Sequence, residues 1–212
     1  MDILIQTLQY IMDPRNNFLG QLGIHIRMSG LALLAAALVG VPLGILVSRY
    51  GTPARVLLNV AGFLRVVPSI VILFVLLPSQ GLGFRPAVIA LTLLAIPPLL
   101  INTDTGMRGV DPAIIEAGRG MGMSYWQMLG RVQLPLAMPV VVAGLRIAAA
   151  EVIASATLAT FIGGGGLGDF IASGLILLRN EILLAGAIPV ALLALAAELL
   201  LSRLQRALEP GT

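Results

Sequence analysis

The chain has 212 residues, of which 58% are hydrophobic and 11% are charged, and its formal net charge is +3. A soluble domain carries about 25% charged residues, so this composition excludes an ordinary soluble globular protein. Several apolar stretches reach the roughly 20 residues that a helix needs to cross a bilayer. The sequence therefore predicts an all-α integral membrane protein.

The charged residues narrow the functional classes further. All 13 basic residues are arginine, and the chain contains no cysteine, which excludes disulfide frameworks and thiolate chemistry. In a membrane protein, an excess of arginine over acidic residues is better explained by the orientation of the helices in the membrane than by nucleic-acid binding. We therefore expect membrane lipid, and no nucleic acid, around this chain.

The N-terminal segment, residues 1–27, precedes the first apolar run of spanning length. Its first 12 residues, MDILIQTLQYIM, carry Asp2, Gln6 and Gln9 and are too short to cross a bilayer. We expect an extracytoplasmic or interfacial helix here, with a further span as the alternative. A basic leader and a small-residue cleavage site are both missing, so a removable signal peptide is not expected.

Five apolar runs predict five transmembrane helices in a single transmembrane domain. They cover approximately residues 28–48, 56–78, 86–103, 140–161 and 182–201. Each run has proline within it or at its edge, at Pro42, Pro68, Pro97, Pro98, Pro139 and Pro189. Because interior proline kinks a helix, the pattern predicts either ordinary kinks or helices that rearrange along a pathway. Gly40 and Gly44 offer a face for close helix packing, within the subunit or between subunits.

Arginine counts favour an N-terminus outside the membrane and a cytoplasmic C-terminus. In that orientation the inner connections hold seven arginines, Arg49, Arg55, Arg108, Arg119, Arg131, Arg203 and Arg206. The outer connections hold four, Arg15, Arg27, Arg85 and Arg179. The remaining two, Arg65 and Arg146, lie near predicted inner ends of spans.

The connection between the third and fourth spans, residues 104–139, is unusually polar and is cytoplasmic in this orientation. Within DPAIIEAGRGMG, Asp111 and Pro112 predict the start of a short helix over residues 112–120. We expect Gly120 and Gly122 to end this helix, both with positive φ.

A second short helix is predicted directly after the first. Ser124 and Gln127 have the spacing of a capping box. Leu134, Pro135 and Pro139 are expected to stop this helix before the fourth span. The connection is thus predicted to be a helix-turn-helix.

The side chains of this connection are mixed in character. Glu116 and Arg119 would be costly in hydrocarbon, whereas Met121 and Trp126 would be poorly placed in water. The mixture indicates either a loop packed on its own bundle or a surface for a protein partner.

The runs EAGRGMG and QLPLAMP resemble the EAA loop of bacterial ABC-importer permeases, the segment that docks onto the ATPase subunit. The family's motif positions are occupied here by Glu116, Ala117, Gly122, Leu134 and Pro135. Gly118 stands where a second alanine is common. The resemblance implies that these residues, together with Trp126, form the ATPase-docking surface.

A narrower resemblance extends from about Leu31 to Pro189. The runs GMGMSYWQMLGRVQLPLAMPVVVAGLR, ATLATFIGGGGLGDF and RVVPS are similar to permeases for glycine betaine, choline and carnitine. The GGLG element also occurs in related methionine and phosphonate permeases. The resemblance implies a type I ABC-importer permease fold with five spans and a cytoplasmic docking loop.

The same resemblance implies the assembly and its location. The chain would be a non-catalytic subunit of the bacterial cytoplasmic membrane, paired with a second permease, two ATPase subunits and an extracytoplasmic binding protein. ATP and Mg would be bound by the ATPases, so no cofactor is expected in this chain. The substrate would be an osmoprotectant, carried by ATP-driven alternating access.

Six residues are candidates for the pathway or its gate: Arg65, Pro68, Glu151, Thr157, Gly164 and Gly165. An ionisable group at the depth of Glu151 should face the bundle or a water-filled cavity. We expect Arg65 as a structural partner for Glu151, with a site for a cationic substrate as the alternative.

The glycine-rich run and the single histidine give no support to an enzymatic site. FIGGGGLGD cannot bind nucleotide phosphates as an ATPase loop does, because the chain has no lysine; an outer loop, a re-entrant turn or a gate is expected instead. His25 is the only histidine and is expected outside the first span, where it supports neither a metal site nor a hydrolase. The remaining alternatives are the same machine carrying methionine or another small polar solute, and a passive channel or structural membrane protein.

Overall fold

The structure is a computed structural model that describes residues 3–50 and 52–209, without the side chains of residues 52–55. Asp2 and the side chain of Arg55 therefore lie outside the described residues. Every regular element in the described part of the chain is helical, which agrees with the all-α prediction. Four of its helices are long and apolar enough to cross a membrane, and one bent helix pair raises the number to five.

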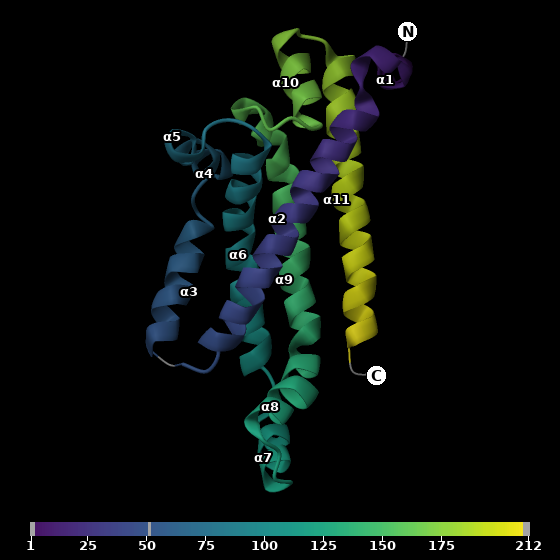
Figure 1. Cartoon of the computed structure of the whole chain (residues 1–212). Helices are drawn as coiled ribbons and strands as arrows, with labels where there is room; N and C mark the ends of the chain where they lie inside the picture. The colour runs from purple at the N-terminus through teal and green to yellow at the C-terminus, as the bar shows by residue number, and fades with distance from the viewer. Residues whose placement is uncertain (1–2, 51, 210–212) are drawn as a thin grey trace.

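The helices follow one another with short connections (Figure 1). The long ones are α2 (Phe18–Val47), α6 (Phe84–Arg108), α9 (Leu134–Ser155) and α11 (Asn180–Leu208). The shorter α-helices are α1 (Ile3–Met12), α3 (Thr52–Leu64), α4 (Ser69–Val75), α5 (Leu77–Gln80), α7 (Pro112–Gly120), α8 (Tyr125–Met128) and α10 (Gly168–Ile176). Three other helical turns are η1 (Pro14–Asn16), η2 (Leu129–Gln133) and η3 (Ala156–Ile162).

The core of the bundle lies between α2, α6 and α9, and α11 packs along the outer side of α9. Gly40 and Gly44 of α2 face α6, where a Cβ on either glycine would crowd Leu99 or Thr103. The missing side chains let the two backbones approach closely. The predicted glycine face thus serves packing within the subunit.

The predicted spans differ from the helices mainly at their ends. α2 begins at Phe18, well before the predicted start at residue 28, because the polar residues that precede the apolar run are already helical. His25 consequently lies inside α2 and is fully buried, so its predicted position outside the first span is wrong. The predicted runs 86–103 and 182–201 lie within the longer helices α6 and α11.

The predicted run 56–78 is two helices rather than one. The helix pair made of residues 56–64 and 69–80 is bent by 98°. Pro68 occupies the N-cap position of α4, with φ −56° and ψ 134°, so the helical path that ends at Leu64 resumes only after this extended residue. Figure 1 shows α3 and α4 on the left of the bundle, apart from α11 on the right.

The fourth span begins earlier than predicted. Helix continues from Tyr125 to Ile162 through the wider turn of η2, so Leu134, Pro135 and Pro139 do not stop it. Pro135 lies in the first turn of α9, where a missing N–H costs least. Proline deeper in a membrane helix is tolerated when neighbouring groups satisfy the freed carbonyl.

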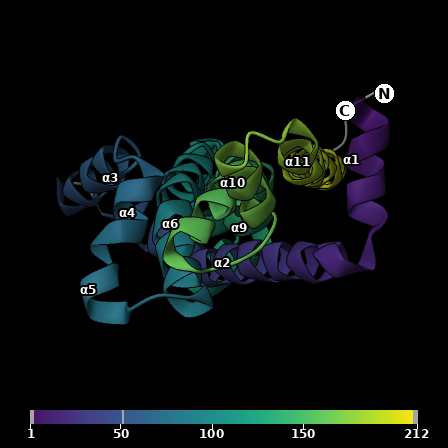
Figure 2. The same ribbon diagram turned by 90° about the horizontal axis from the view of Figure 1, so that it is seen from above.

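The short helices α1 and α10 lie beside α11 at the end of the bundle opposite α7 and α8 (Figure 1). Viewed from above, α1 lies beyond α11, and α3 to α5 lie on the other side of the bundle (Figure 2). The ring of Phe170 in α10 contacts the rings of Tyr10 and Phe18, with centroids 5.9 and 6.0 Å away. The predicted N-terminal helix is thus present and packs on the bundle through aromatic contacts.

Candidate functional site

The segment that contains α7 and α8, predicted to dock onto an ATPase and called the docking loop below, begins with a capped helix. Asp111 Oδ1 accepts a hydrogen bond of 2.8 Å from the Ala113 amide, and Pro112 occupies the first turn of α7. The helix ends at Gly120, as predicted from the sequence. The turn that follows has φ +77° at Gly122, whereas Gly120 remains helical, so the positive φ predicted for Gly120 is wrong.

The second helix of the loop, α8, has the predicted capping box. The Ser124 amide donates to Gln127 Oε1 at 2.8 Å, and the Gln127 amide donates to Ser124 Oγ at 3.4 Å. These bonds satisfy two of the free amides at the helix start. They fix the direction in which α8 leaves the turn.

Gly118 allows the two helices of the loop to pack closely on each other. It is the buried glycine of α7, and a Cβ at this position would overlap Met128 Cε of α8. Met128 is itself 5% exposed. An alanine here would force the end of the flexible Met128 side chain to shift, so the glycine allows α7 and α8 to pack as one unit.

The outer surface of the loop carries most of the predicted docking residues. Glu116, Ala117, Gly122 and Trp126 are exposed, and Trp126 and Met121 are 75% and 76% exposed. Large apolar side chains open to solvent beside a carboxylate are typical of a surface that a protein partner covers. Leu134 is half-buried and Pro135 exposed at the start of α9, beneath this surface.

The predicted pair between Arg65 and Glu151 is present. Arg65 Nη2 lies 3.7 Å from Glu151 Oε1, and the two side chains are 40% and 35% exposed. Arg65 belongs to the break between α3 and α4, and Glu151 to α9. Charged groups at membrane depth face protein or a water-filled cavity rather than lipid.

The other pathway candidates lie in two separate parts of the chain and in different environments. Pro68 is exposed at the α3–α4 break, close in sequence to Arg65. Thr157 Oγ1 donates to the Ala154 carbonyl at 2.7 Å, so its hydroxyl is used within the helix. Gly164 is buried against Ala159, where a Cβ would be crowded by its side chain and carbonyl.

The glycine loop between η3 and α10 is held by side chains that the sequence analysis did not single out. Gln21 Oε1 accepts from the Gly166 amide at 2.7 Å, and Gln21 Nε2 donates to Asp169 Oδ2 at 3.2 Å. Thr160 Oγ1 donates to the other carboxylate oxygen of Asp169. Positive φ at Gly163, Gly165 and Gly166 gives the loop its tight path, which makes it a pinned turn.

Two further contacts stabilise the bundle around these residues. His25 Nε2 lies 3.1 Å from the Ile153 carbonyl and joins α2 to α9. Arg146 of α9 forms an ion pair with Glu198 of α11. Among the described residues, no group of three or more His, Asp or Glu side chains could hold a metal ion.

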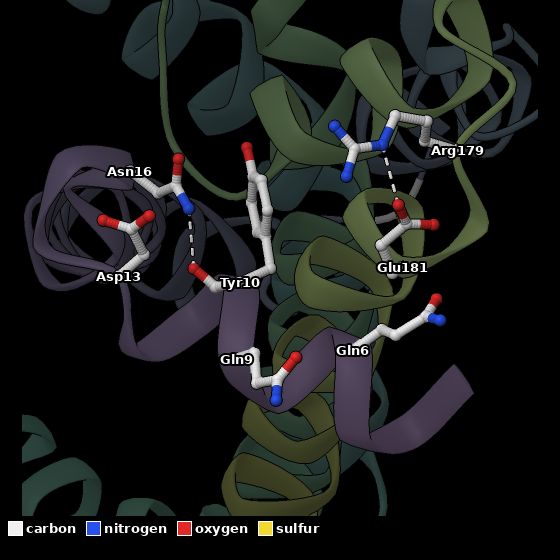
Figure 3. Close-up of a pocket in the computed structure, with 7 residues that line it drawn as sticks. All are labelled: Gln6, Gln9, Tyr10, Asp13, Asn16, Arg179 and Glu181. Atoms are coloured by element: carbon white, nitrogen blue, oxygen red, sulfur yellow. Dashed lines mark hydrogen bonds and ion pairs between the residues drawn. The ribbon is translucent and has the colours of Figure 1, made fainter. Parts of the chain in front are cut away.

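A polar pocket lies between α1 and the start of α11, at the end of the bundle that carries α10 (Figure 3). It has a volume of about 400 Å³ and is lined by Gln6, Gln9, Tyr10, Asp13, Asn16, Arg179 and Glu181. Two contacts order its wall: Asn16 Nδ2 donates to the Tyr10 carbonyl at 2.7 Å, and Arg179 Nε donates to Glu181 at 2.7 Å. Side-chain hydrogen bonds from Arg15 hold the pKa of Asp13 below its ordinary value. The charges here are largely used in internal pairs.

The chain is similar to a known family over most of its length. The sequence model of a family described as "Binding-protein-dependent transport system inner membrane component" matches residues 40–212. The chain belongs to this family. It is a multi-pass inner-membrane permease subunit of an ABC transporter and is non-catalytic, since ATP belongs to the partner ATPase. Membership also removes the passive channel and the purely structural protein as alternatives.

The sequence of this permease is similar to those of individual relatives over most of its length. It is 44% identical over 210 residues to the carnitine transport permease protein OpuCB of Listeria monocytogenes, which covers 99% of this chain and 95% of that protein. It is 41% identical over 187 residues to the choline transport system permease protein OpuBB of Bacillus subtilis, covering 88% and 86%. The osmoprotectant import permease protein OsmW of Salmonella typhimurium is 36% identical over 211 residues, covering 97% and 98%.

Solved structures show the same fold. A chain of the inward-facing MetNI methionine ABC transporter superposes with a TM-score of 0.83 at 21% identity, covering 93% of this permease and 99% of that chain. A chain of an amino acid ABC transporter with histidines gives a TM-score of 0.72 at 20% identity, covering 99% and 98%. These likenesses confirm the ABC-importer permease fold.

Proposed function

We propose that this permease forms the translocation pathway of an ABC importer for osmoprotectants such as glycine betaine, choline and carnitine. The observation that carries the proposal is sequence likeness along nearly the full chain to permeases named for these solutes, at 36% to 44% identity. The likeness to a methionine transporter is at 21% identity and supports the fold alone. Osmoprotectants are therefore the favoured cargo, and methionine is the second candidate.

The assembly is proposed to contain two permeases, two ATPase subunits and one extracytoplasmic binding protein. The exposed apolar residues of α3, of α4 and of the break between them support a second permease on that side of the bundle. They are Val56, Val60, Phe63, Val66, Phe74 and Val75. The ion pair of Arg65 and Glu151 is partly exposed near this face, and a second permease would shield it from lipid.

The docking loop is proposed to bind the ATPase subunit through Glu116, Ala117, Gly122 and Trp126. Their exposure supports this role, as does the packing of Gly118 on Met128, because a rigid unit transmits force better than a flexible loop. Segment 104–139 and the C-terminus would then be cytoplasmic, and α1 and α10 would lie outside. The two sets lie at opposite ends of the bundle (Figure 1), which fits this orientation.

The pathway is proposed to run past the α3–α4 break. Arg65, Pro68 and Glu151 would line it, and Thr157, Gly164 and Gly165 would form the gate on the outer side. ATP binding would draw the two docking loops together and open the pathway outward by rigid-body movement of the helices. Hydrolysis would reset the inward-facing state.

Tight recognition of the cation is proposed to belong to the separate binding protein. Quaternary ammonium groups are recognised by cages of aromatic side chains, and this chain has one Trp, three Tyr and six Phe. Of these, Trp126 is assigned to the docking surface. A permease that must release its cargo also needs a weak site.

The decisive experiment begins with the cognate binding protein. Its affinity for glycine betaine, choline, carnitine and methionine is measured, and each ligand is then tested for ATP-dependent uptake into vesicles with the complete transporter. We expect saturable uptake of at least one quaternary ammonium solute, and none without the binding protein. Methionine as the only ligand bound and transported would overturn the proposed cargo.

A further inference from the structure

The inner end of α2 is tied to the end of α6. Arg108, the last residue of α6, donates from Nη2 to the carbonyls of Val47 and Tyr50, at 2.9 and 3.0 Å. Its Nε donates to Asp104 Oδ1 at 2.8 Å, and Asp104 is 6% exposed. The turn after α2 is therefore fixed to the helix that leads into the docking loop.

The same turn also contacts the docking loop itself. The guanidinium carbon of Arg49 lies 3.5 Å from the centre of the Tyr125 ring and 5.9 Å from that of Trp126. The two rings meet edge to face, with centroids 5.1 Å apart. A planar guanidinium stacked on an aromatic face is a cation–π contact that lysine reproduces only in part.

These contacts connect two segments that the proposed cycle must move together. Tyr125 is the first residue of α8, which is packed against α7 and held by its capping box. Arg49 lies in the short connection between the end of α2 at Val47 and the start of α3 at Thr52. Helix α3 leads to the break that carries Arg65. A displacement of α8 therefore reaches the connection before α3 through the contact of Arg49 with Tyr125, in addition to the packing of α3 on α6.

We infer that Arg49 is a positioning residue that transmits movement of the docking loop to α3 by its contact with the ring of Tyr125. The inference rests on the proposed docking function of α7 and α8. Arg108 makes the turn after α2 rigid through its two carbonyl bonds. A force on Arg49 therefore displaces the α2–α3 connection and does not merely bend a flexible turn. Without the contact, the ATPase would still dock and hydrolyse ATP, but a given movement of the docking loop would displace α3 less.

The test uses the complete transporter in vesicles, with uptake, ATP hydrolysis and affinity for the ATPase subunit measured on each variant. Arg49→Ala and Tyr125→Leu are expected to lower uptake about two- to fivefold, the size that an exposed cation–π contact supports. Affinity for the ATPase stays unchanged, so the ATP hydrolysed per solute rises. Tyr125→Phe keeps the ring and should retain more uptake than Tyr125→Leu, and Arg49→Lys should fall between wild type and Arg49→Ala.

A double variant and a matched control separate transmission from other roles. Arg49→Ala combined with Tyr125→Leu should be no worse than either change alone, since both remove one contact. Arg203→Ala removes an exposed arginine from the C-terminal part of α11 and should leave uptake unchanged. Additive losses, a parallel loss of ATPase affinity, or unchanged uptake in Arg49→Ala would each overturn the inference.

A further variant keeps this inference distinct from the proposed docking function. Glu116→Lys should abolish productive docking whatever Arg49 does. If Glu116→Lys leaves ATPase binding and uptake intact, the proposed docking function fails. If Glu116→Lys acts as expected while Arg49→Ala does not, the transmission role of Arg49 alone is overturned.

Discussion

Arg65 Nη2 lies 3.7 Å from Glu151 Oε1, between the α3–α4 break and the C-terminal part of α9. This distance exceeds the 2.7–3.2 Å typical of an N–H···O hydrogen bond, so the two groups attract without a short directional bond. Both side chains remain more than a third exposed, which weakens the attraction further. A pair of this kind holds the break in place and can still separate when α3 moves.

Replacing Glu151 by Gln tests whether this pair belongs to the pathway. The change keeps the side-chain size and removes the charge, so membrane levels should remain normal. Uptake should fall up to about fivefold, because an exposed ion pair contributes no more than roughly 1 kcal/mol. The charge-swapped variant Arg65→Glu with Glu151→Arg should recover part of the loss. Unchanged uptake at normal membrane levels would remove Glu151 from the pathway.

Substitutions on the docking surface should separate insertion from coupling. Glu116→Lys reverses an exposed charge on α7, and Gly122→Asp places a side chain on a residue with φ +77°. Both should abolish most uptake and co-purification of the ATPase while the permease still inserts. Glu209→Lys, the same reversal just after α11, is the matched control and should behave as wild type. Normal uptake in Glu116→Lys would argue against docking through this surface.

Gly118→Ala should disturb the docking loop from inside. The new methyl group would overlap Met128 Cε, the end of a flexible side chain that can shift, so the overpacking should cost about 1 kcal/mol, the low end for such changes. The packing of α7 on α8 should then loosen, with a modest reduction of ATPase binding measured on the purified permease. Met128→Ala in the same chain makes room for the methyl group and should restore part of the binding. Equal defects in the single and double variants would show that the overlap is not the cause.

The local features of the docking loop could be predicted because their causes lie within a few residues. The Asp111 cap, the end of α7 at Gly120 and the capping box of Ser124 with Gln127 all follow from neighbouring side chains. Pro135 and Pro139 do not stop the helix that follows α8, since a first-turn proline such as Pro135 fits a helix start as well as a helix stop.

Features that depend on distant parts of the chain could not be predicted in the same way. Proline at position 68 predicts a kink, but the 98° bend depends on how α3 and α4 pack against α6. Gln21 contacts a carboxylate 148 positions away, and no spacing rule connects the two. The stack of Arg49 on Tyr125 likewise appears only once the bundle is folded.

Gln21 holds the glycine loop between η3 and α10 in place. Gln21 is the one side chain that both accepts from the Gly166 amide and donates to Asp169 in the described part of the protein, so Gln21→Leu removes both bonds at once. Each net hydrogen bond stabilises by about 0.5–1.5 kcal/mol, and amide exchange over residues 163–169 should therefore accelerate by roughly tenfold or more. Gln9→Leu, a change in exposed α1, should leave that exchange unaltered.

Transport by the same variant decides whether the pinned loop acts as a gate. If Gly164 and Gly165 belong to the outer gate, loosening the loop should lower uptake while ATP hydrolysis persists, because the outer side no longer closes firmly behind the solute. Gln21→Glu keeps the acceptor for the Gly166 amide but places a second carboxylate beside Asp169, so it should weaken the loop by repulsion instead. Faster exchange in Gln21→Leu with full uptake would assign the loop to stability and leave the gate elsewhere.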